Sequence, residues 1–345
     1  MGEGVTQAVQ RDATLFPRGQ GSAVLAADIG GTYARLGVVH GDAGVPTVAG
    51  YRKYRCADYP TLTAIFEDFL GGQQDRTMVA HCAIACAGYV LDDAVINANL
   101  PWPVSLTRIR ADLGLADLRV VNDFTAIAFA TSYVTTQDVT PVAVATGAIA
   151  GPVLVVGPGT GLGAAVRISG AQSTVILSTE AGQAALTAST ALEIDVLRGL
   201  LADDRSHVPT EQILSGPGLA NLYAAIGRLR GAKVSERSPR EIADAAMAGT
   251  DALARETLQT FCGWLGSVVG NLVMLYGAQG GVYLAGGILP QIREFLLRSD
   301  FVERFRNKGA MRAVLERVPV NLIEHGQLGV LGAAGWFLEN QPHSR

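Results

Sequence analysis

The sequence predicts an α/β protein made of two similar units, and two observations predict it. A buried strand, a glycine turn and a second strand open a pattern at Val24 and open it again at Val153. The chain is also 345 residues long, which at roughly 150 residues per domain suggests about two domains. Two domains of this kind are expected to place small ligands in a cleft between them.

Short apolar runs bounded by glycine predict the strands of the first unit, and amphipathic spacing predicts its helices. Strands are expected at Val24–Ile29, Arg35–Val39, Tyr51–Arg55, around Cys82 and at Leu118–Val121. Helices are expected at Thr61–Leu70, at Leu106–Leu113 and from Phe124 onward. The first unit therefore begins with a β-hairpin and continues as alternating strands and helices.

The second unit repeats this order and then becomes mainly helical. Strands are expected at Val153–Val156, Ala164–Ile168, Thr174–Leu177, Gly281–Ala285 and Val318–Ile323. Helices are expected at Thr190–Leu201, Leu219–Leu229 and Val330–Leu338. A long apolar stretch covers Arg240–Tyr276, and because glycine disfavours helix interiors we expect it to be broken at its glycines, Gly249, Gly263, Gly266 and Gly270.

Composition and charge exclude several classes of partner. The net charge is -4 and no basic run occurs, so neither a nucleic acid nor an anionic membrane surface is expected as a partner. Residues 1–22 contain charges and no secretory apolar core, which predicts a flexible N-terminal extension rather than a signal peptide. Four cysteines in apolar surroundings, including Cys82 and Cys86 on one expected strand, suggest core packing and a cytoplasmic protein.

The first glycine turn, Asp28–Thr32, joins two expected strands. Glycines without Cβ atoms let a phosphate oxygen approach the backbone amides, and Asp28 is suited to holding a hydrated magnesium ion beside it. An ordinary hairpin turn is the alternative interpretation.

The second glycine turn, Gly157–Gly163, has alternating glycines and is followed by a strand. It therefore matches neither the dinucleotide fingerprint nor a Walker loop. The chain has only three lysines, Lys53, Lys233 and Lys308, and none is beside a glycine turn in the sequence. We accordingly expect magnesium and backbone amides to meet the charge of a transferring phosphoryl group.

Asn122 and Asp123 end an expected strand immediately before a helix, which is where α/β folds place ligands. Asp123 could cap that helix or could accept the proton of an attacking hydroxyl group. Glu180 and Glu211 lie in glycine-containing segments, and carboxylates of this kind recognise the neighbouring hydroxyls of sugars.

These motifs resemble the bacterial glucokinase family, within the superfamily of sugar kinases, actin and heat-shock chaperone ATPases. The likeness spans Leu25 to Leu338, and its most specific segments are Asp28–Leu36, Val121–Ala126, Gly157–Gly163, Leu214–Tyr223 and Leu284–Pro290. The resemblance implies two ribonuclease-H-like α/β domains flanking a nucleotide and sugar cleft. It places the smaller domain at 23–133 plus 325–345 and the larger domain at 134–324.

The resemblance also implies roles for individual residues. The nucleotide-binding residues would be Ala27, Asp28, Ile29, Gly30, Gly31 and Thr32 in the first turn, Gly159, Thr160 and Gly161 in the second, and Gly286 and Gly287 at the adenosine. The sugar-binding set would be Asn122, Asp123, Glu180, Gln183 and Glu211, with Asp123 as the catalytic base. The implied cofactors are ATP and Mg²⁺, the implied substrate is a hexose, and the implied assembly is a homodimer.

Three residues depart from the family pattern. Gln183 stands in place of a sugar-binding histidine, Ala181 in place of a glycine, and Tyr33 in place of an asparagine. The expected function is phosphorylation of the 6-hydroxyl of glucose. The alternatives are a kinase of another hexose and a regulator that binds sugar and nucleotide with little turnover.

Overall fold

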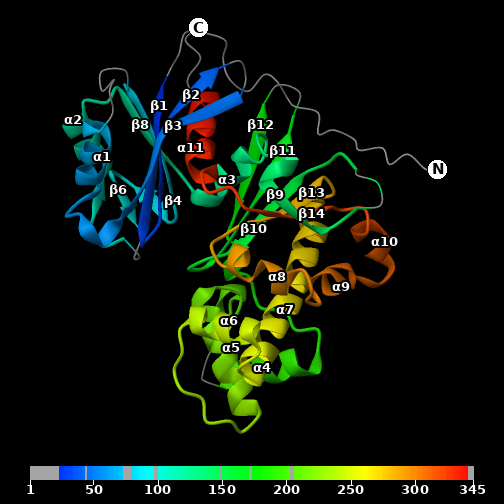
Figure 1. Ribbon diagram of the computed structural model, residues 1–345. Helices are drawn as coiled ribbons and strands as arrows, with labels where there is room; N and C mark the ends of the chain where they lie inside the picture. Colours follow the sequence, from blue (N-terminus) through cyan, green and yellow to red (C-terminus); the bar gives the residue numbers. More distant parts are fainter. Residues whose placement is uncertain are drawn as a thin grey trace. The chain divides into compact units, whose positions relative to one another are not determined.

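The computed structural model describes residues 23–42, 45–72, 79–96, 100–145, 147, 149–170, 173–202 and 206–340. The contacts divide the chain into two compact units (Figure 1). Unit 1 comprises Met1–Asp138 and His325–Arg345, and unit 2 comprises Val139–Glu324. The expected extension at residues 1–22 lies outside the described residues.

The sheet of unit 1 has the order β3-β2-β1-β4-β8. Strands β1, β2 and β3 form an antiparallel meander, whereas β4 and β8 continue the sheet parallel to β1. Their bounds are β1 Val24–Ile29, β2 Tyr33–Asp42, β3 Val45–Arg55, β4 His81–Cys86 and β8 Asp117–Val121. The hairpin strands β2 and β3 are longer than expected because their pairing continues to Asp42 and Val45.

Helices cover both faces of this sheet (Figure 1). Helices α1 (Leu62–Gly71) and α2 (Leu106–Leu113) lie on one face, and α3 (Asp123–Ala130) and α11 (Leu328–Glu339) lie on the other. Helix α11 packs on α3, β1 and β4, so the end of the chain completes the unit that the beginning of the chain starts. Covered faces explain why β1 is almost entirely apolar rather than alternating.

A second, three-stranded sheet in unit 1 was not expected from the sequence. It consists of β5 (Tyr89–Leu91), β6 (Ala94–Ile96) and β7 (Val104–Ser105). The side chain of Asp93 ties it together by accepting hydrogen bonds from the Ser105 hydroxyl at 2.5 Å and from the Thr107 backbone amide at 2.7 Å. Strands of two or three residues are too short to give a readable periodicity.

The sheet of unit 2 repeats the pattern of unit 1 and adds a strand, with the order β12-β11-β10-β13-β14-β9. Strands β10, β11 and β12 form the antiparallel meander, β13 and β14 run parallel to β10, and β9 pairs antiparallel with β14. The bounds are β9 Val139–Ala143, β10 Val153–Pro158, β11 Leu162–Ser169, β12 Thr174–Thr179, β13 Gly281–Leu284 and β14 Val320–Ile323. The prediction of one design used twice is therefore confirmed.

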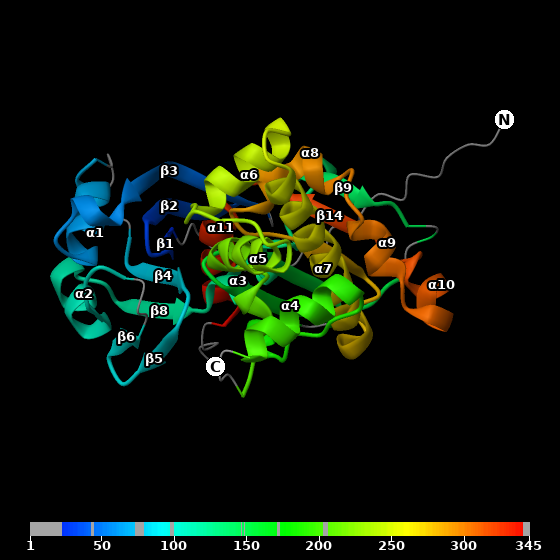
Figure 2. The same ribbon diagram turned by 90° about the horizontal axis from the view of Figure 1, so that it is seen from below.

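Helices form the rest of unit 2, and α4, α5, α6 and α7 pack together (Figure 2). The bounds are α4 Ala191–Ala202, α5 Gly216–Leu229, α6 Pro239–Ala248, α7 Ala252–Tyr276, α8 Arg293–Leu296, α9 Phe301–Arg306 and α10 Arg312–Leu315. Helix α7 is the one described helix that is long and apolar enough to cross a membrane, but 72% of its apolar window is buried inside the protein. It is the core helix of unit 2.

Of the four glycines at which the stretch Arg240–Tyr276 was expected to break, only Gly249 ends a helix. Gly249 does end α6, with a φ of +69°. The expected breaks at Gly263, Gly266 and Gly270 are wrong, because α7 runs through all three. A methyl group at Gly266 would lie 2.2 Å from the carbonyl oxygen of Phe301, and these glycines instead let α9 pack closely on α7.

Candidate active-site residues in each unit

The first glycine turn lies between β1 and β2 and is fixed by three hydrogen bonds. The amide of Gly30 donates to the carbonyl oxygen of Tyr33 at 3.0 Å. Cys56, just after β3, donates its amide to the Thr32 carbonyl oxygen at 3.0 Å and its thiol to the Gly30 carbonyl oxygen at 3.4 Å. The end of β3 therefore holds the turn in place.

Ala27 and Ile29, which were expected to contact the nucleotide, have fully buried side chains in the core of unit 1. Only their backbone groups could meet a ligand. Thr32 is exposed at the tip of the turn, and Gly30 and Gly31 are half-buried. The accessible part of the predicted site is thus Gly30–Thr32 together with the side chain of Asp28.

Residues of β2 and α11 lie against the carboxylate of Asp28. Nη1 of Arg35, on β2, donates to it at 3.1 Å, and only 23% of the Asp28 side chain is exposed. A methyl group at Gly329, in the first turn of α11, would lie 2.6 Å from the carboxyl carbon. Burial raises the pKa of Asp28 above its usual value, although the positive charge of Arg35 opposes this effect.

Asn122 and Asp123 divide two roles that the sequence could not separate. The Asn122 side chain is the N-cap of α3, with its Oδ1 accepting from the Thr125 amide at 3.1 Å. Asp123 is the first residue of the helix, and its Oδ1 accepts from the Phe124 amide at 2.9 Å. The interpretation of Asp123 as the cap is therefore wrong. The helix N-terminus stabilises its carboxylate form.

The second glycine turn lies between β10 and β11 and rests on the start of α5. The Gly159 amide donates to the Gly161 carbonyl oxygen at 2.8 Å, and the Gly159 carbonyl oxygen accepts from the Gly216 amide at 2.8 Å. Ser215 caps α5 by accepting from the Gly218 amide at 2.9 Å. Thr160 is exposed at the tip of this turn.

Gly286 and Gly287 follow β13 and lie against the end of β10. Gly286 has a φ of +88°, and a methyl group there would lie 2.4 Å from the carbonyl oxygen of Pro158. A methyl group at Gly157 would lie 2.1 Å from the carbonyl oxygen of Ala285. Because neither position has room for a side chain, the two predicted nucleotide segments of unit 2 meet backbone to backbone.

Two of the predicted sugar ligands are in direct contact. The Nε2 group of Gln183 donates to Oε1 of Glu211 at 2.7 Å, and the Leu162 amide donates to Oε2 of the same carboxylate at 3.2 Å. A methyl group at Gly161 would lie 2.5 Å from that Oε2 atom. Glu211 therefore joins the sugar-binding segment to the second glycine turn.

A short backbone ladder holds the Gln183 and Glu211 segments side by side. The Leu186 amide donates to the Val208 carbonyl oxygen at 2.9 Å, and the Thr210 amide donates to the Ala184 carbonyl oxygen at 2.8 Å. Nε2 of His207 lies 2.9 Å from the Gln183 carbonyl oxygen. Glu180 is fixed through its backbone, since its carbonyl oxygen accepts from the Gln183 amide at 2.9 Å.

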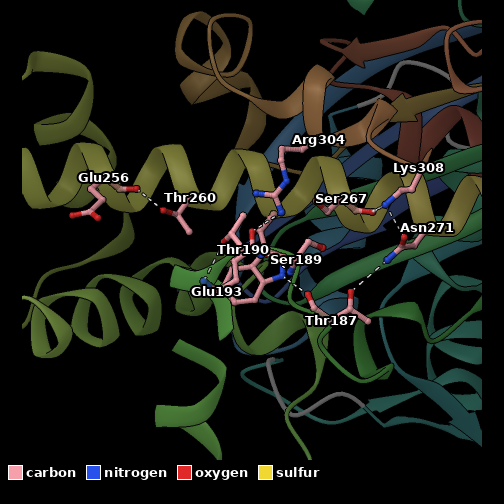
Figure 3. Close-up of polar contacts among 11 residues, drawn as sticks. Thr187, Ser189, Thr190, Glu193, Glu256, Thr260, Ser267, Asn271, Arg304 and Lys308 are labelled. Carbon is pink, nitrogen blue, oxygen red and sulfur yellow. Dashed lines mark hydrogen bonds and ion pairs between the residues drawn. The ribbon is translucent and has the colours of Figure 1, made fainter. Parts of the chain in front are cut away.

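A polar network behind this segment anchors it to α7 (Figure 3). Nε1 of Trp264 donates to the Thr187 carbonyl oxygen at 2.7 Å, and Nδ2 of Asn271 reaches the Thr187 hydroxyl at 3.4 Å. Lys308 donates to Oδ1 of Asn271 at 2.7 Å. Burial lowers the pKa of the Lys308 ammonium group. The nearby Glu193 is fully buried and pairs with Arg304 at 2.7 Å (Figure 3).

A model of the glucokinase family matches residues 25–340, which is most of the chain. The chain belongs to the glucokinase family. The protein is thus a hexose kinase of this family. Across the described residues, no group of three or more histidine, cysteine, aspartate or glutamate side chains is arranged to hold a metal ion.

Individual glucokinase-family proteins support this assignment. A glucokinase-like protein of Xylella fastidiosa (strain Temecula1) is 52% identical over 338 residues, covering 96% of this chain and 98% of the relative. The crystal structure of a glucokinase from an Antarctic psychrotroph is 34% identical, with a TM-score of 0.81 and coverage of 93% and 99%.

The two-domain fold of actin-like sugar kinases is shared more widely. A ROK family glucokinase from Streptomyces griseus, solved in complex with glucose and AMPPNP, has a TM-score of 0.61. It is 21% identical and covers 91% of this chain and 98% of its own. The predicted family and fold class are therefore confirmed.

Strand pairing brings Lys53, which is distant from the first glycine turn in the sequence, to the residue that directly follows that turn. Lys53 pairs with Arg35 across β2 and β3, and its ammonium group lies 3.8 Å from the ring centroid of Tyr33. Tyr33 directly follows Thr32, the last residue of the first turn. This contact could not be predicted from a local motif, because the pairing of β2 with β3 brings Lys53 to Tyr33.

A cavity beside α5 was also missed. Its volume is about 280 Å³, and it is lined by Asn221, Tyr223 and Ala224 of α5 and by residues 234–237. The hydroxyl of Tyr223 donates to Asp251 at 2.9 Å, and Arg237 pairs with the same carboxylate at 2.7 Å. Asn221 and Tyr223 stand in the segment Leu214–Tyr223 that carries the family resemblance, but nothing in the local sequence indicates that residues 234–237 line a cavity with them.

Proposed function

We propose that this glucokinase-family protein transfers the γ-phosphoryl group of ATP to the 6-hydroxyl of glucose, with Asp123 as the general base. The observation that carries the proposal is the division of labour at the start of α3. Asn122 caps the helix, so the acidic residue beside it is not needed for capping. A carboxylate at the carboxyl end of a strand is placed as phosphoryl transfer to a hydroxyl requires.

Asp123 takes the proton of the 6-hydroxyl as that oxygen attacks the γ-phosphorus. The oxygen–phosphorus bond forms while the bond from the γ-phosphorus to its bridging oxygen breaks, and ADP leaves with the electron pair. The start of α3 favours negative charge at this position. Asp123 and the first glycine turn both belong to unit 1.

The two proposed sugar-binding glutamates, Glu180 and Glu211, both belong to unit 2. The Gln183–Glu211 hydrogen bond fixes both side chains, and each Glu211 oxygen still has a lone pair with which to accept a hydroxyl group. With its amide donating to Glu211, Gln183 directs its own oxygen elsewhere as an acceptor. Glu180 and Asn122 complete the proposed sugar-binding set.

The nucleotide lies along the glycine turns in this proposal. Gly30–Thr32 and Gly159–Gly161 approach its phosphates, and Gly286–Gly287 approach the adenosine. The cavity beside α5 suits the adenine ring, because α5 begins at Gly216, which is bonded to the second turn. Ala220, which also lines the cavity, is four positions after Gly216, a rise of about 6 Å along a helix.

Magnesium fits Asp28 only indirectly. Its carboxylate is an oxygen donor of the type that Mg²⁺ prefers, but one oxygen already accepts from Arg35, and burial raises the pKa of the group. Asp28 would therefore hold the ion through water. When bound, the ion supplies charge neutralisation of the β- and γ-phosphates.

The regulator with little turnover is the second candidate, because Gln183 occupies the position of a family histidine. A coupled assay of ADP release, run with Mg·ATP on a panel of hexoses, tests the proposal. Turnover with glucose at ordinary kinase rates, which are about 1–100 per second, supports it. Nucleotide and sugar binding without ADP release would favour the regulator. A homodimer and a cytoplasmic location stay predictions.

A further inference from the structure

We infer that Lys53, held over the ring of Tyr33, binds the terminal phosphates of the nucleotide at the first glycine turn. This inference rests on the proposed function, since it takes ATP to be the ligand of that turn. It gives the turn a cationic side chain that residues 28–32 do not contain.

The pairing of three strands puts Lys53 in line with Asp28. Arg35 is the cross-strand partner of Asp28 on β1 and of Lys53 on β3. Directly paired residues project from the same face of a sheet, so these three side chains form one row across β1, β2 and β3. Lys53 thus stands on the face of the sheet that presents the carboxylate of Asp28.

The same pairing brings the end of β3 to the glycine turn. Tyr33 pairs with Arg55, and the next residue, Cys56, donates its amide to Thr32 and its thiol to Gly30. Arg35 pairs with Lys53, and Tyr33 is two residues before Arg35 on the same strand. Residues two apart on a strand project from the same face, so Tyr33 and Lys53 share a face. The ammonium group therefore contacts the side chain of the residue that directly follows the turn.

Among the described residues, no carboxylate pairs with Lys53, whereas Arg35 and Arg55 on the same face each have one. Arg35 pairs with Asp28 at 3.1 Å, and Arg55 lies 4.0 Å from Asp58. None of the ion pairs between described residues includes Lys53. A polyphosphate would supply the missing negative charge, and an ammonium group offers it three hydrogen-bond donors.

The Tyr33 ring explains how a long exposed side chain is ready to bind. A lysine side chain loses much rotational freedom when it is fixed, which weakens binding by an unrestrained lysine. The ring face attracts the ammonium group at 3.8 Å and so fixes it in advance. Asparagine, which the family resemblance places at this position, has no ring and could not do so.

Direct binding measurements test the inference with or without catalysis. Isothermal titration of Mg·ATP, AMP and glucose would be compared for the wild type, Lys53→Met, Lys53→Arg, Tyr33→Phe and Tyr33→Asn. The matched control is Arg108→Met, which removes a cation from the exposed face of α2 in the same unit. Melting temperatures for all variants separate a purely structural role of the Tyr33–Lys53 contact from phosphate binding.

We expect Lys53→Met to weaken Mg·ATP binding on the order of tenfold, the effect of losing a charge-assisted hydrogen bond, while AMP and glucose binding stay near the wild type. Lys53→Arg should keep most of the affinity. Tyr33→Phe keeps the ring and should weaken Mg·ATP less than Tyr33→Asn does. The salt dependence of Mg·ATP binding should also be shallower in Lys53→Met than in Arg108→Met.

The outcomes distinguish this inference from the proposed function. If the wild type phosphorylates glucose and Lys53→Met binds Mg·ATP as Arg108→Met does, Lys53 has no phosphate role and the kinase proposal stands. If the wild type releases no ADP with any hexose but Lys53→Met selectively loses Mg·ATP, the phosphate role stands and the kinase proposal falls. A wild type that binds neither Mg·ATP nor AMP overturns both.

Discussion

The side-chain amide of Gln183 donates a hydrogen bond to the carboxylate of Glu211 at 2.7 Å, across 28 residues of sequence. The bond matters because Gln183 stands where the family resemblance places a sugar-binding histidine. The Gln183 side chain is held in place by this hydrogen bond. Its amide nitrogen is engaged with Glu211, so its oxygen is the atom oriented to accept from a hydroxyl group.

Restoring a histidine is expected to tighten sugar binding without changing the chemistry. In Gln183→His, one better hydroxyl contact is worth about 1 kcal/mol, which corresponds to a few-fold to tenfold lower KM for glucose. The value of kcat should stay similar, because Asp123 is unchanged. Steady-state kinetics on glucose and other hexoses measure both constants.

Gln183→Glu is the matched control, since it keeps the shape of the side chain and changes its charge. It replaces a hydrogen bond to Glu211 by the repulsion of two neighbouring carboxylates, so KM for glucose should rise. If neither substitution changes KM for any hexose, Gln183 does not face the sugar.

Asp123→Asn is expected to lower kcat on the order of 100- to 10,000-fold, because it removes basicity and keeps size. Glucose binding, measured by titration calorimetry, should persist. The fold should be little affected, since Asn122 and not Asp123 caps α3. A variant with near-normal kcat would exclude Asp123 as the base.

Asn122→Ala provides the complementary measurement. It removes the Oδ1 acceptor of the Thr125 amide, and loss of such a cap destabilises a protein by about 1 kcal/mol. Chemical denaturation of both variants should therefore show the larger loss of stability in Asn122→Ala. The larger loss of kcat should be in Asp123→Asn.

The strands and glycine turns of both units could be predicted from the sequence because each is a local pattern. Val24–Ile29 and Val153–Val156 are short apolar runs that end at glycine, and the structure has strands there. The helix break expected at Gly266 was wrong, because this glycine is required by tertiary packing and not by a helix end. The position of Phe301 on α9 decides that residue 266 must lack a side chain.

The candidate site divides in the same way. Asp28, Asp123, Glu180 and Glu211 stand in recognisable segments, so they could be proposed individually. Lys53 could not, because its place beside Tyr33 depends on the register of β2 and β3, including a shift between Leu36 and Val38. The cavity beside α5 depends likewise on how the segment at residues 234–237 packs on that helix.

Two glycines in helices are expected to respond to alanine with opposite signs. At Gly266 a methyl group would clash with the Phe301 carbonyl oxygen, so Gly266→Ala should destabilise unit 2 by about 1–3 kcal/mol. Gly199 lies in α4 with nothing within 4 Å of an added methyl group, so Gly199→Ala should stabilise by about 0.5–1 kcal/mol. Equal effects in urea denaturation would refute the close packing of α9 on α7.

Asp28 is expected to trade stability for activity. Burial raises the pKa of its carboxyl group above 3.8, so ionising Asp28 costs the folded state more than the unfolded state. The stability linked to the neutral form is complete below the unfolded pKa and is lost as pH rises through the folded pKa. Asp28→Asn keeps an acceptor for Arg35 without the buried charge. It should therefore raise the melting temperature at pH 7, and this gain should shrink toward pH 4.

The same substitution should damage catalysis if Asp28 holds magnesium through water. Rates measured against Mg²⁺ concentration should show a higher requirement for the ion in Asp28→Asn and a lower maximal rate, and the wild type should lose activity in excess EDTA. Arg108→Met, which alters a charge on α2, should match the wild type in both assays. Full wild-type activity in EDTA would exclude the magnesium role.

For the stability prediction, a melting temperature of Asp28→Asn below that of the wild type at pH 7 would show that the Asp28–Arg35 ion pair outweighs the cost of burying the charge.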